Sequence, residues 1–181
     1  MSNTSEKHWF HGVLLYSSQL GGIAIGGHKK AGKTELGIRL IQNYGFSLIA
    51  DDIGFIMYHD DGIILLGYEN RIATKFFKYI ERKVGKIKYT FTAPLRVGVY
   101  LKRNPGKLQI KQVDRDEGVN LWIKMLYGSR PTERFLKRLL TIPLFLIECD
   151  YEVNISTIAR ELVNFLSTQS NLYNAPTATT S

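Results

Sequence analysis

Hydrophobic and polar positions along the chain form two kinds of pattern, short apolar runs and apolar stripes at helical spacing. The apolar runs predict strands over residues 8–16, 22–25, 46–50, 53–58, 63–68, 96–101, 108–113 and 142–149. The stripes predict helices over residues 34–44, from 71 through at least 83, 117–127, 132–140 and from 155 onward, with Asn154 as the cap of the last helix. We therefore expect an α/β fold, a mixed sheet with flanking helices.

Hairpin signals interrupt the alternation of strands and helices. The runs 53–58 and 63–68 flank an Asp-Gly turn, and the runs 96–101 and 108–113 flank Asn-Pro-Gly. The first two runs of the chain can also pair as a hairpin. Antiparallel pairs of this kind argue against a uniformly parallel, doubly wound sheet and favour a mixed one.

The domain organisation is expected to be simple. A length of 181 residues suits one domain, and we place it over residues 1–168 because the sequence shows no internal repeat and no interdomain linker. Residues 169–181 are polar and are expected to form a flexible tail.

Composition narrows the cellular setting. A hydrophobic fraction of 44% is enough for a packed core. No apolar run is long enough to span a membrane, and the polar stretch Met1–Lys7 lacks a secretory signal. The single cysteine, Cys149, lies in an apolar run and is expected to be a buried, inert thiol. We therefore expect a cytoplasmic protein without membrane contact.

The formal net charge of +8 admits several partners. It suits a phosphate-bearing ligand, an acidic protein or nucleic acid, although a solvated lysine-rich surface is the commoner explanation. The sequence contains no helix-turn-helix, RNA-recognition signature or zinc-ligand spacing. A nucleic-acid-processing NTPase is therefore the least favoured of these options.

The most specific motif spans Gly27 to Thr34, which fits the phosphate-binding pattern G-x-x-x-x-G-K-[ST] at every fixed position. An apolar run precedes it and a helical stripe follows it, as this motif requires. Glycines let backbone N–H groups approach phosphate oxygens, and the following helix directs its positive end at the same anion. We predict a nucleotide-binding loop made by Gly27, His28, Lys29, Lys30, Ala31, Gly32, Lys33, Thr34 and Glu35.

A second polar motif, Asp51-Asp52, follows the apolar run 46–50. Lys33 can reach the β- and γ-phosphates and Thr34 can ligate Mg²⁺, while a carboxylate at the end of a neighbouring strand would complete the metal shell. One aspartate would hold the metal, and the other would accept the proton of an attacking hydroxyl or water. An isolated Asp-Asp pair would indicate a solvent-exposed turn. The nearby phosphate-binding loop (P-loop) instead favours a role for both aspartates in the nucleotide site.

Three motifs in order resemble the catalytic domain of the bacterial HPr kinase/phosphorylase family: His11-Gly12-Val13, Gly32-Lys33-Thr34-Glu35, and Leu48-Ile49-Ala50-Asp51-Asp52. The resemblance covers roughly residues 8–56. It implies the nucleotide-binding core of HPr kinase and PEP carboxykinase, and an ATP- and Mg²⁺-dependent kinase that phosphorylates a serine hydroxyl. By position it makes Lys33 a ligand of the β- and γ-phosphates, and Thr34 and Asp52 the metal ligands. It also makes Asp51 the general base and His11 a catalytic neighbour of the transferred phosphate.

The chain also departs from the family pattern. Residues 67–71 replace the family's glutamate-isoleucine-arginine-glycine signature, and there Glu69 and Arg71 are candidate contacts to substrate or phosphate. The family's lysine-rich C-terminal segment is missing. The chain looks more like the short HPr-kinase-like proteins, some of which sit beside peptide-modifying enzymes and phosphorylate a serine of a precursor peptide.

Two functions from different classes follow. The first is a kinase that transfers the γ-phosphoryl group of ATP to a serine or threonine hydroxyl of a peptide or protein. The basic segment 71–88 would then dock an acidic peptide or the incoming phosphate, or else face solvent. The second is a nucleotide-binding switch or slow NTPase without a phosphoryl acceptor. The family forms hexamers, so the resemblance leaves a homo-oligomer open.

Overall fold

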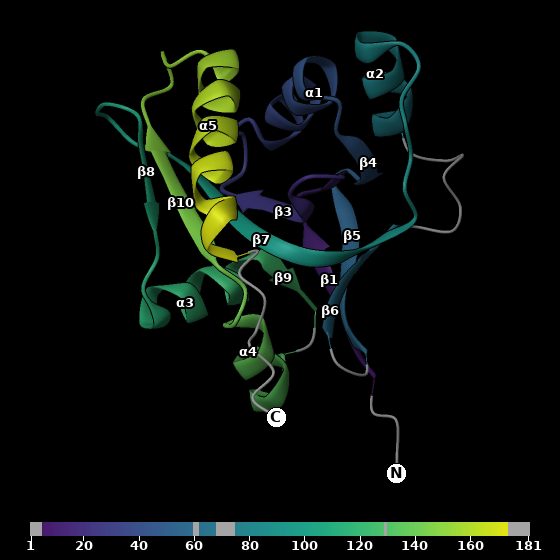
Figure 1. The fold of residues 1–181 in the computed structure, drawn as a ribbon, viewed down its shortest axis with the longest axis vertical. Helices are drawn as coiled ribbons and strands as arrows, with labels where there is room; N and C mark the ends of the chain where they lie inside the picture. Colours follow the sequence, from purple (N-terminus) through teal and green to yellow (C-terminus); the bar gives the residue numbers. More distant parts are fainter. Residues whose placement is uncertain (1–4, 60–61, 68–74, 129, 174–181) are drawn as a thin grey trace.

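The computed structural model describes residues 5–59, 62–67, 75–128 and 130–173. Its strands are β1 (Glu6–His11), β2 (Val13–Ser17), β3 (Gly21–Gly27), β4 (Ser47–Ala50), β5 (Ile53–His59), β6 (Gly62–Leu66), β7 (Thr92–Arg103), β8 (Gln109–Gln112), β9 (Leu126–Tyr127) and β10 (Leu144–Cys149). Its helices are α1 (Lys33–Tyr44), α2 (Lys75–Val84), α3 (Arg115–Met125), α4 (Glu133–Leu139) and α5 (Ile155–Tyr173). Figure 1 shows their arrangement.

The strands of the described residues form one mixed sheet in the order β4-β2-β3-β7-β6-β5-β1-β9, with β10 beside β7 and β8 beside β10. The long strand β7 crosses the middle of the molecule and joins the two parts of the sheet (Figure 1). β3 is parallel to β7 over residues 95–101 and β10 over residues 98–103, whereas β6 is antiparallel to residues 92–94. The expected mixed α/β sheet is confirmed.

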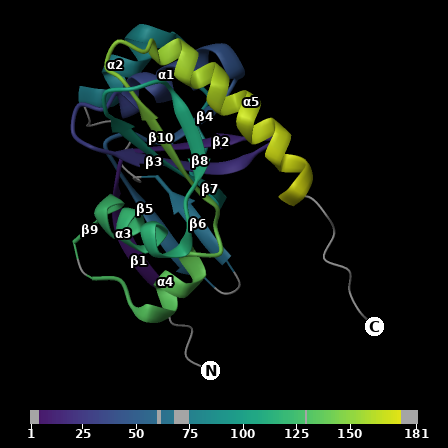
Figure 2. The same ribbon diagram turned by 90° about the vertical axis from the view of Figure 1, so that its left-hand side faces the viewer.

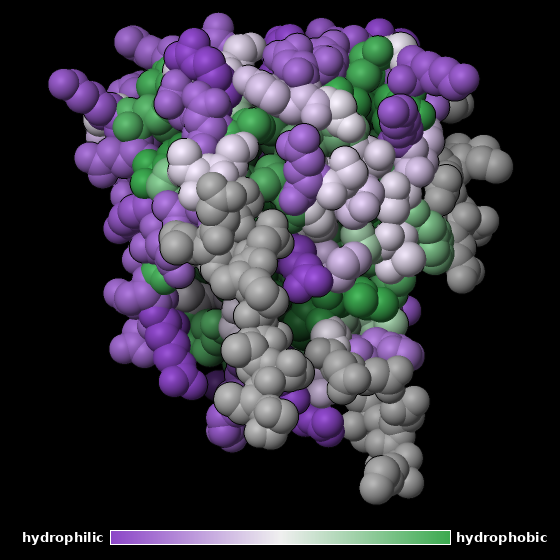
Figure 3. All heavy atoms as spheres, viewed as in Figure 1, coloured by the Kyte–Doolittle hydropathy of each residue, from purple (hydrophilic) through white to green (hydrophobic). Residues whose placement is uncertain are grey.

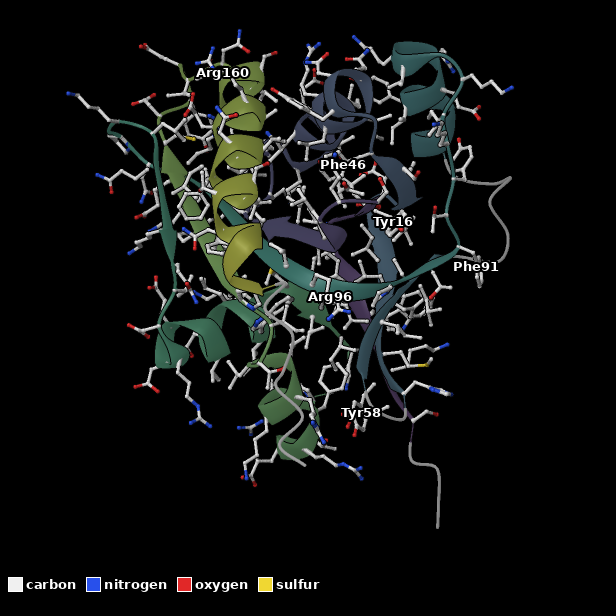
Figure 4. The ribbon with its side chains drawn as sticks, in the orientation of Figure 1. Tyr16, Phe46, Tyr58, Phe91, Arg96 and Arg160 are labelled. Carbon is white, nitrogen blue, oxygen red and sulfur yellow. The ribbon has the colours of Figure 1, made fainter. Side chains whose placement is uncertain are left out.

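Helices cover both faces of this sheet. Figure 2 shows α1, α2 and α5 on one side and α3 and α4 on the other. Strand alternation supplies two cores: Ile23 and Ile25 of β3 pack beneath α1 and α5, while Ala24 faces the side of α3 and α4. In Figure 4, Phe46 lies beside α1 and belongs to the first core, whereas Tyr58 lies near α4 and belongs to the second.

Two strand predictions need correction. The run 8–16 is two strands, because Gly12 interrupts it at a point where a Cβ atom would lie 2.1 Å from the carbonyl oxygen of Ile25. Its second half, β2, pairs with β3 as expected, but β1 pairs with β5. The predicted pairing of 96–101 with 108–113 is wrong, because β10 lies between β7 and β8. The hairpin of β5 and β6 is confirmed.

The helices follow their sequence signals, except that the predicted helix 117–127 is wrong at its end: α3 spans Arg115–Met125, and Leu126–Tyr127 form strand β9 beside β1. α1 ends at Tyr44, and Gly45 has the left-handed backbone (φ 70°) expected of a helix stop. Asn154 accepts a hydrogen bond of 2.8 Å from the Ser156 N–H at the start of α5. α5 continues to Tyr173, past Gln169, where the polar tail was expected to begin. No helix in the described residues has the length and apolar character needed to cross a bilayer.

Candidate active site

The loop between β3 and α1 has the conformation that the sequence motif predicts. Gly27 (φ 143°) and Gly32 (φ 97°) both adopt backbone angles that favour glycine. At Gly27 the chain also passes so close to β7 that a Cβ atom would lie 2.1 Å from the carbonyl oxygen of Leu101. Gly32 caps α1, and its carbonyl accepts the first helical hydrogen bond from Leu36, at 2.8 Å. Glycine is therefore required at both ends of the loop.

Lys33 folds back over this loop. Its Nζ donates hydrogen bonds to the carbonyl oxygens of Gly27 (3.1 Å) and His28 (2.9 Å). Burial lowers the pKa of Lys33, and the nearby carboxylates of Asp52 and Asp51 partly offset this shift. The ammonium group is thus held at the centre of the curled backbone, where a phosphate group would bind.

Asp51 lies at the end of β4 and is almost completely buried, with 3% of its surface exposed. Its Oδ1 accepts a hydrogen bond of 3.0 Å from the hydroxyl of Thr34 on α1. Its Oδ2 is buried and has no hydrogen-bond partner among the described residues. Burial raises the pKa of Asp51 to about 6, although the hydrogen bonds from Thr34 and the Asp52 backbone act in the opposite direction.

Asp52 lines the same cavity but is much more exposed than Asp51. Its backbone is left-handed (φ 69°), and the Ile53 N–H donates back across it to the Asp51 carbonyl at 2.9 Å. Its carboxylate Oδ1 lies 3.5 Å from Nε2 of His11, and both side chains are roughly half exposed. The tight turn lets two adjacent carboxylates reach the same site from different directions.

These groups line one cavity of about 600 Å³. His11, Lys33, Thr34, Asp51 and Asp52, which the sequence singled out, all contribute to it. Its remaining lining residues are Gly12, Val13, Lys29, Lys30, Gly32, Glu35 and Tyr79. The cavity therefore brings together the three sequence motifs, and α2 adds the ring of Tyr79, which sequence reasoning did not single out.

Other predicted site residues do not line this cavity. Ala31 belongs to the loop, but it is buried, with 1% exposure. His28 turns toward β7, where its ring meets the edge of Tyr100 at 5.7 Å between centroids, and it lines a second cavity of about 310 Å³. Glu69 and Arg71 lie outside the described residues.

Arg103, at the C-terminal end of β7, is a further member of this region that the sequence did not indicate. Its Nε donates to the carbonyl oxygen of Ala31 in the loop (3.0 Å), and its Nη1 donates to the carbonyl oxygen of Asp150 (2.6 Å). Locally, Arg103 is only a charged residue at a strand end. Its role depends on the parallel pairing of β3 with β7, which no local pattern predicts.

The donor set has the chemistry of a magnesium and phosphate site. Mg²⁺ commonly binds one or two carboxylates together with phosphate oxygens and water, and Thr34 and Asp52 would supply a hydroxyl and a carboxylate oxygen. The buried Oδ2 of Asp51, which has no partner among the described residues, is a ready acceptor for a proton. Within the described residues, no cluster of three or more His, Cys, Asp or Glu side chains is arranged to hold a metal by itself.

Comparison with known proteins reveals similarity in structure rather than in sequence. No protein-family model matches the chain, and no curated protein has a matching sequence. A solved structure of the Hpr(Ser) kinase/phosphatase from Coxiella burnetii superposes with a TM-score of 0.53 and 15% sequence identity, over 90% of this chain and 98% of that chain. An identity this low speaks for the fold alone. The chain therefore has an HPr kinase-like fold, with a P-loop-type sequence where its central strand β3 meets α1.

Proposed function

We propose that this protein is an ATP- and Mg²⁺-dependent kinase that transfers the γ-phosphoryl group to a serine or threonine hydroxyl of a peptide or protein. The observation that carries the proposal is the convergence of Lys33, Thr34 and both aspartates on one cavity. A phosphate-binding loop alone suits any nucleotide-binding protein. Beside that loop, Oδ2 of Asp51 has no partner within the part of the chain that the structure describes, and such an oxygen suits activation of a hydroxyl.

Each residue then has a chemical task. Lys33 and the loop N–H groups bind the phosphates, and Asp51 accepts the acceptor hydroxyl proton at Oδ2. The new bond joins the acceptor oxygen to the γ-phosphorus as the bond to the β,γ-bridging oxygen breaks, which releases ADP. Thr34 and Asp52 would hold Mg²⁺, which supplies positive charge that neutralises the phosphate oxygens. His11 would donate a hydrogen bond to the transferred group.

The structural neighbour supports the acceptor class. Its name describes a kinase and phosphatase that acts on a serine of HPr. A serine or threonine of a peptide or protein is therefore the acceptor that we propose. The basic segment 71–88, of which residues 71–74 lie outside the described residues, would then dock an acidic peptide. A nucleotide-dependent switch without an acceptor is the alternative.

The test is mass spectrometry of serine-containing peptides incubated with the protein, ATP and Mg²⁺. The panel includes peptides encoded beside its gene. We expect a phosphopeptide with the wild-type protein and none with Lys33→Ala, whereas the exposed-lysine control Lys107→Ala retains activity. Asp51→Asn should still bind ATP but lose transfer by about 10²–10⁴-fold, and the exposed control Asp116→Asn should not.

The alternative makes a different prediction. Tight ATP binding without any phosphopeptide would contradict the kinase and favour the switch. Unchanged transfer in Asp51→Asn would remove Asp51 from the role of base, and Asp52, beside His11, would then be the next carboxylate to substitute.

A further inference from the structure

The loops that follow the parallel strands lie in a fixed order along one edge of the sheet. β4, β3, β7 and β10 all point the same way, because β2 is antiparallel to both β4 and β3, and β7 is parallel to both β3 and β10. Their carboxyl ends carry Asp51-Asp52, the phosphate-binding loop, Arg103 and the loop 150–154. Ligands of open α/β sheets bind at this edge.

This order sets the direction of a bound nucleotide. The carboxylates that would act on the γ-phosphoryl group lie on the β4 side of the phosphate-binding loop. An extended nucleoside triphosphate with its γ-phosphate there must direct its nucleoside toward the opposite side. That side carries Arg103 and the loop between β10 and α5.

Arg103 ties these two parts together. Besides the Ala31 and Asp150 carbonyls, its Nη1 reaches the Val153 carbonyl at 3.3 Å. The loop also meets α5 directly, because a Cβ atom on Gly32 would lie 2.9 Å from Cδ1 of Ile155. The segment 150–154 is therefore linked to the phosphate-binding loop through Arg103.

Tyr151 is the prominent side chain of this segment. Its side chain is largely exposed, with 69% of the residue's surface accessible. The Arg103 guanidinium carbon lies over its ring, 5.8 Å from the ring centre. An aromatic ring that contacts Arg103, a residue bonded to the phosphate-binding loop, and that is open to solvent can stack on a nucleobase.

We propose that Tyr151 is the platform on which the adenine of ATP stacks, with Arg103 fixing the platform relative to the phosphate-binding loop. The proposal rests on the proposed function in taking ATP as the ligand. It adds a nucleoside subsite, formed by the loop between β10 and α5, to the phosphate site.

The experiment compares calorimetric binding of ATP with that of inorganic tripolyphosphate, both with Mg²⁺. The second probe carries the phosphates without a base. We expect Tyr151→Ala to weaken ATP binding by about tenfold and to leave tripolyphosphate binding unchanged. Tyr151→Phe keeps the ring and should bind ATP like the wild type. Tyr127→Ala, which removes an equally exposed tyrosine from β9 (72% accessible), is the matched control.

Two results would overturn the subsite. One is wild-type affinity for ATP in Tyr151→Ala, and the other is an equal loss of affinity for both probes. A wild-type protein that binds neither probe would overturn the subsite and the phosphate site together. The expected binding pattern without any phosphopeptide product would refute the proposed kinase while supporting the nucleoside subsite.

Discussion

At the residue scale, Asp51 carries a charge where the protein interior disfavours charge. Its Oδ1 accepts a hydrogen bond from the Thr34 hydroxyl, and its buried Oδ2 has no partner among the described residues. Burial raises its pKa from 3.8 to about 6, so folding favours its protonated form. Groups of this kind are typical of sites whose chemistry is maintained at the expense of stability.

Because burying ionised Asp51 costs free energy, we predict that Asp51→Asn stabilises the folded protein. A shift of that size disfavours ionised Asp51 by about 3 kcal/mol near pH 7. Because the folded pKa is raised, stability falls as the pH rises from about 4 through 6. The variant should therefore gain about 1–3 kcal/mol in free energy of unfolding at pH 7.5, and little at pH 4. Urea denaturation at both pH values measures this, and a variant less stable than the wild type at pH 7.5 would refute the prediction.

Gly27 yields a second residue-scale prediction, because its backbone angle and its surroundings both exclude a side chain. Gly27→Ala must displace the β7 backbone at Leu101, and we expect a loss of about 2–4 kcal/mol in unfolding free energy. Gly45→Ala is the matched control: Gly45 also has a positive φ, but no atom lies within 4 Å of the added Cβ. Its loss should be about 1 kcal/mol. Thermal denaturation of both variants separates crowding from backbone strain, and equal losses would contradict the crowding argument.

At the element scale, the local pattern predicted what depends on local chemistry. Neighbouring residues determine three features that the structure confirms: the loop from Gly27 to Thr34, the helix stop at Gly45 and the hairpin at the Asp-Gly sequence. Partners distant in sequence were not predictable in this way. The position of β10 between β7 and β8 and the separation of β1 from β2 depend on which apolar faces meet, and many pairings satisfy the same alternation.

Arg103 is a contact between distant residues that the local pattern did not predict. It links β7 to the phosphate-binding loop and to the loop after β10, and this link can be tested. Arg103→Lys keeps the charge, but a single ammonium group cannot reproduce the planar fork that joins the Ala31 and Asp150 carbonyls. We expect the variant to lose about 1–3 kcal/mol in unfolding free energy and to show faster amide exchange in the phosphate-binding loop.

The matched control is Arg160→Lys on α5, a residue that Figure 4 labels on the outside of the molecule. Its ion pair with Glu161 is exposed, so its substitution should change the unfolding free energy by less than about 0.5 kcal/mol. Hydrogen exchange in the loop that is equal in the two variants would show that Arg103 does not hold it.

At the scale of the whole molecule, the edge of the sheet says more about function than the surface charge does. Hydrophilic side chains dominate the upper edge of the view in Figure 3, where α1, α2 and α5 lie, and its left-hand edge, where β8 and α3 lie. The composition predicted such a surface, but a charge of +8 does not identify a partner. What distinguishes the molecule is the single edge where loops from four parallel strands meet.

The central position of β7 has a consequence for synthesis on the ribosome. β3 and the phosphate-binding loop emerge early, but their neighbour, residues 92–103, follows much later, and β10 (residues 144–149) later still. Until then the nascent chain exposes the unpaired edge of β3, which invites association with other strands. The edge of the sheet that carries the candidate site can form only after residues 144–149 have been translated, so termination before β10 would yield a fragment with an unpaired strand edge that is prone to association.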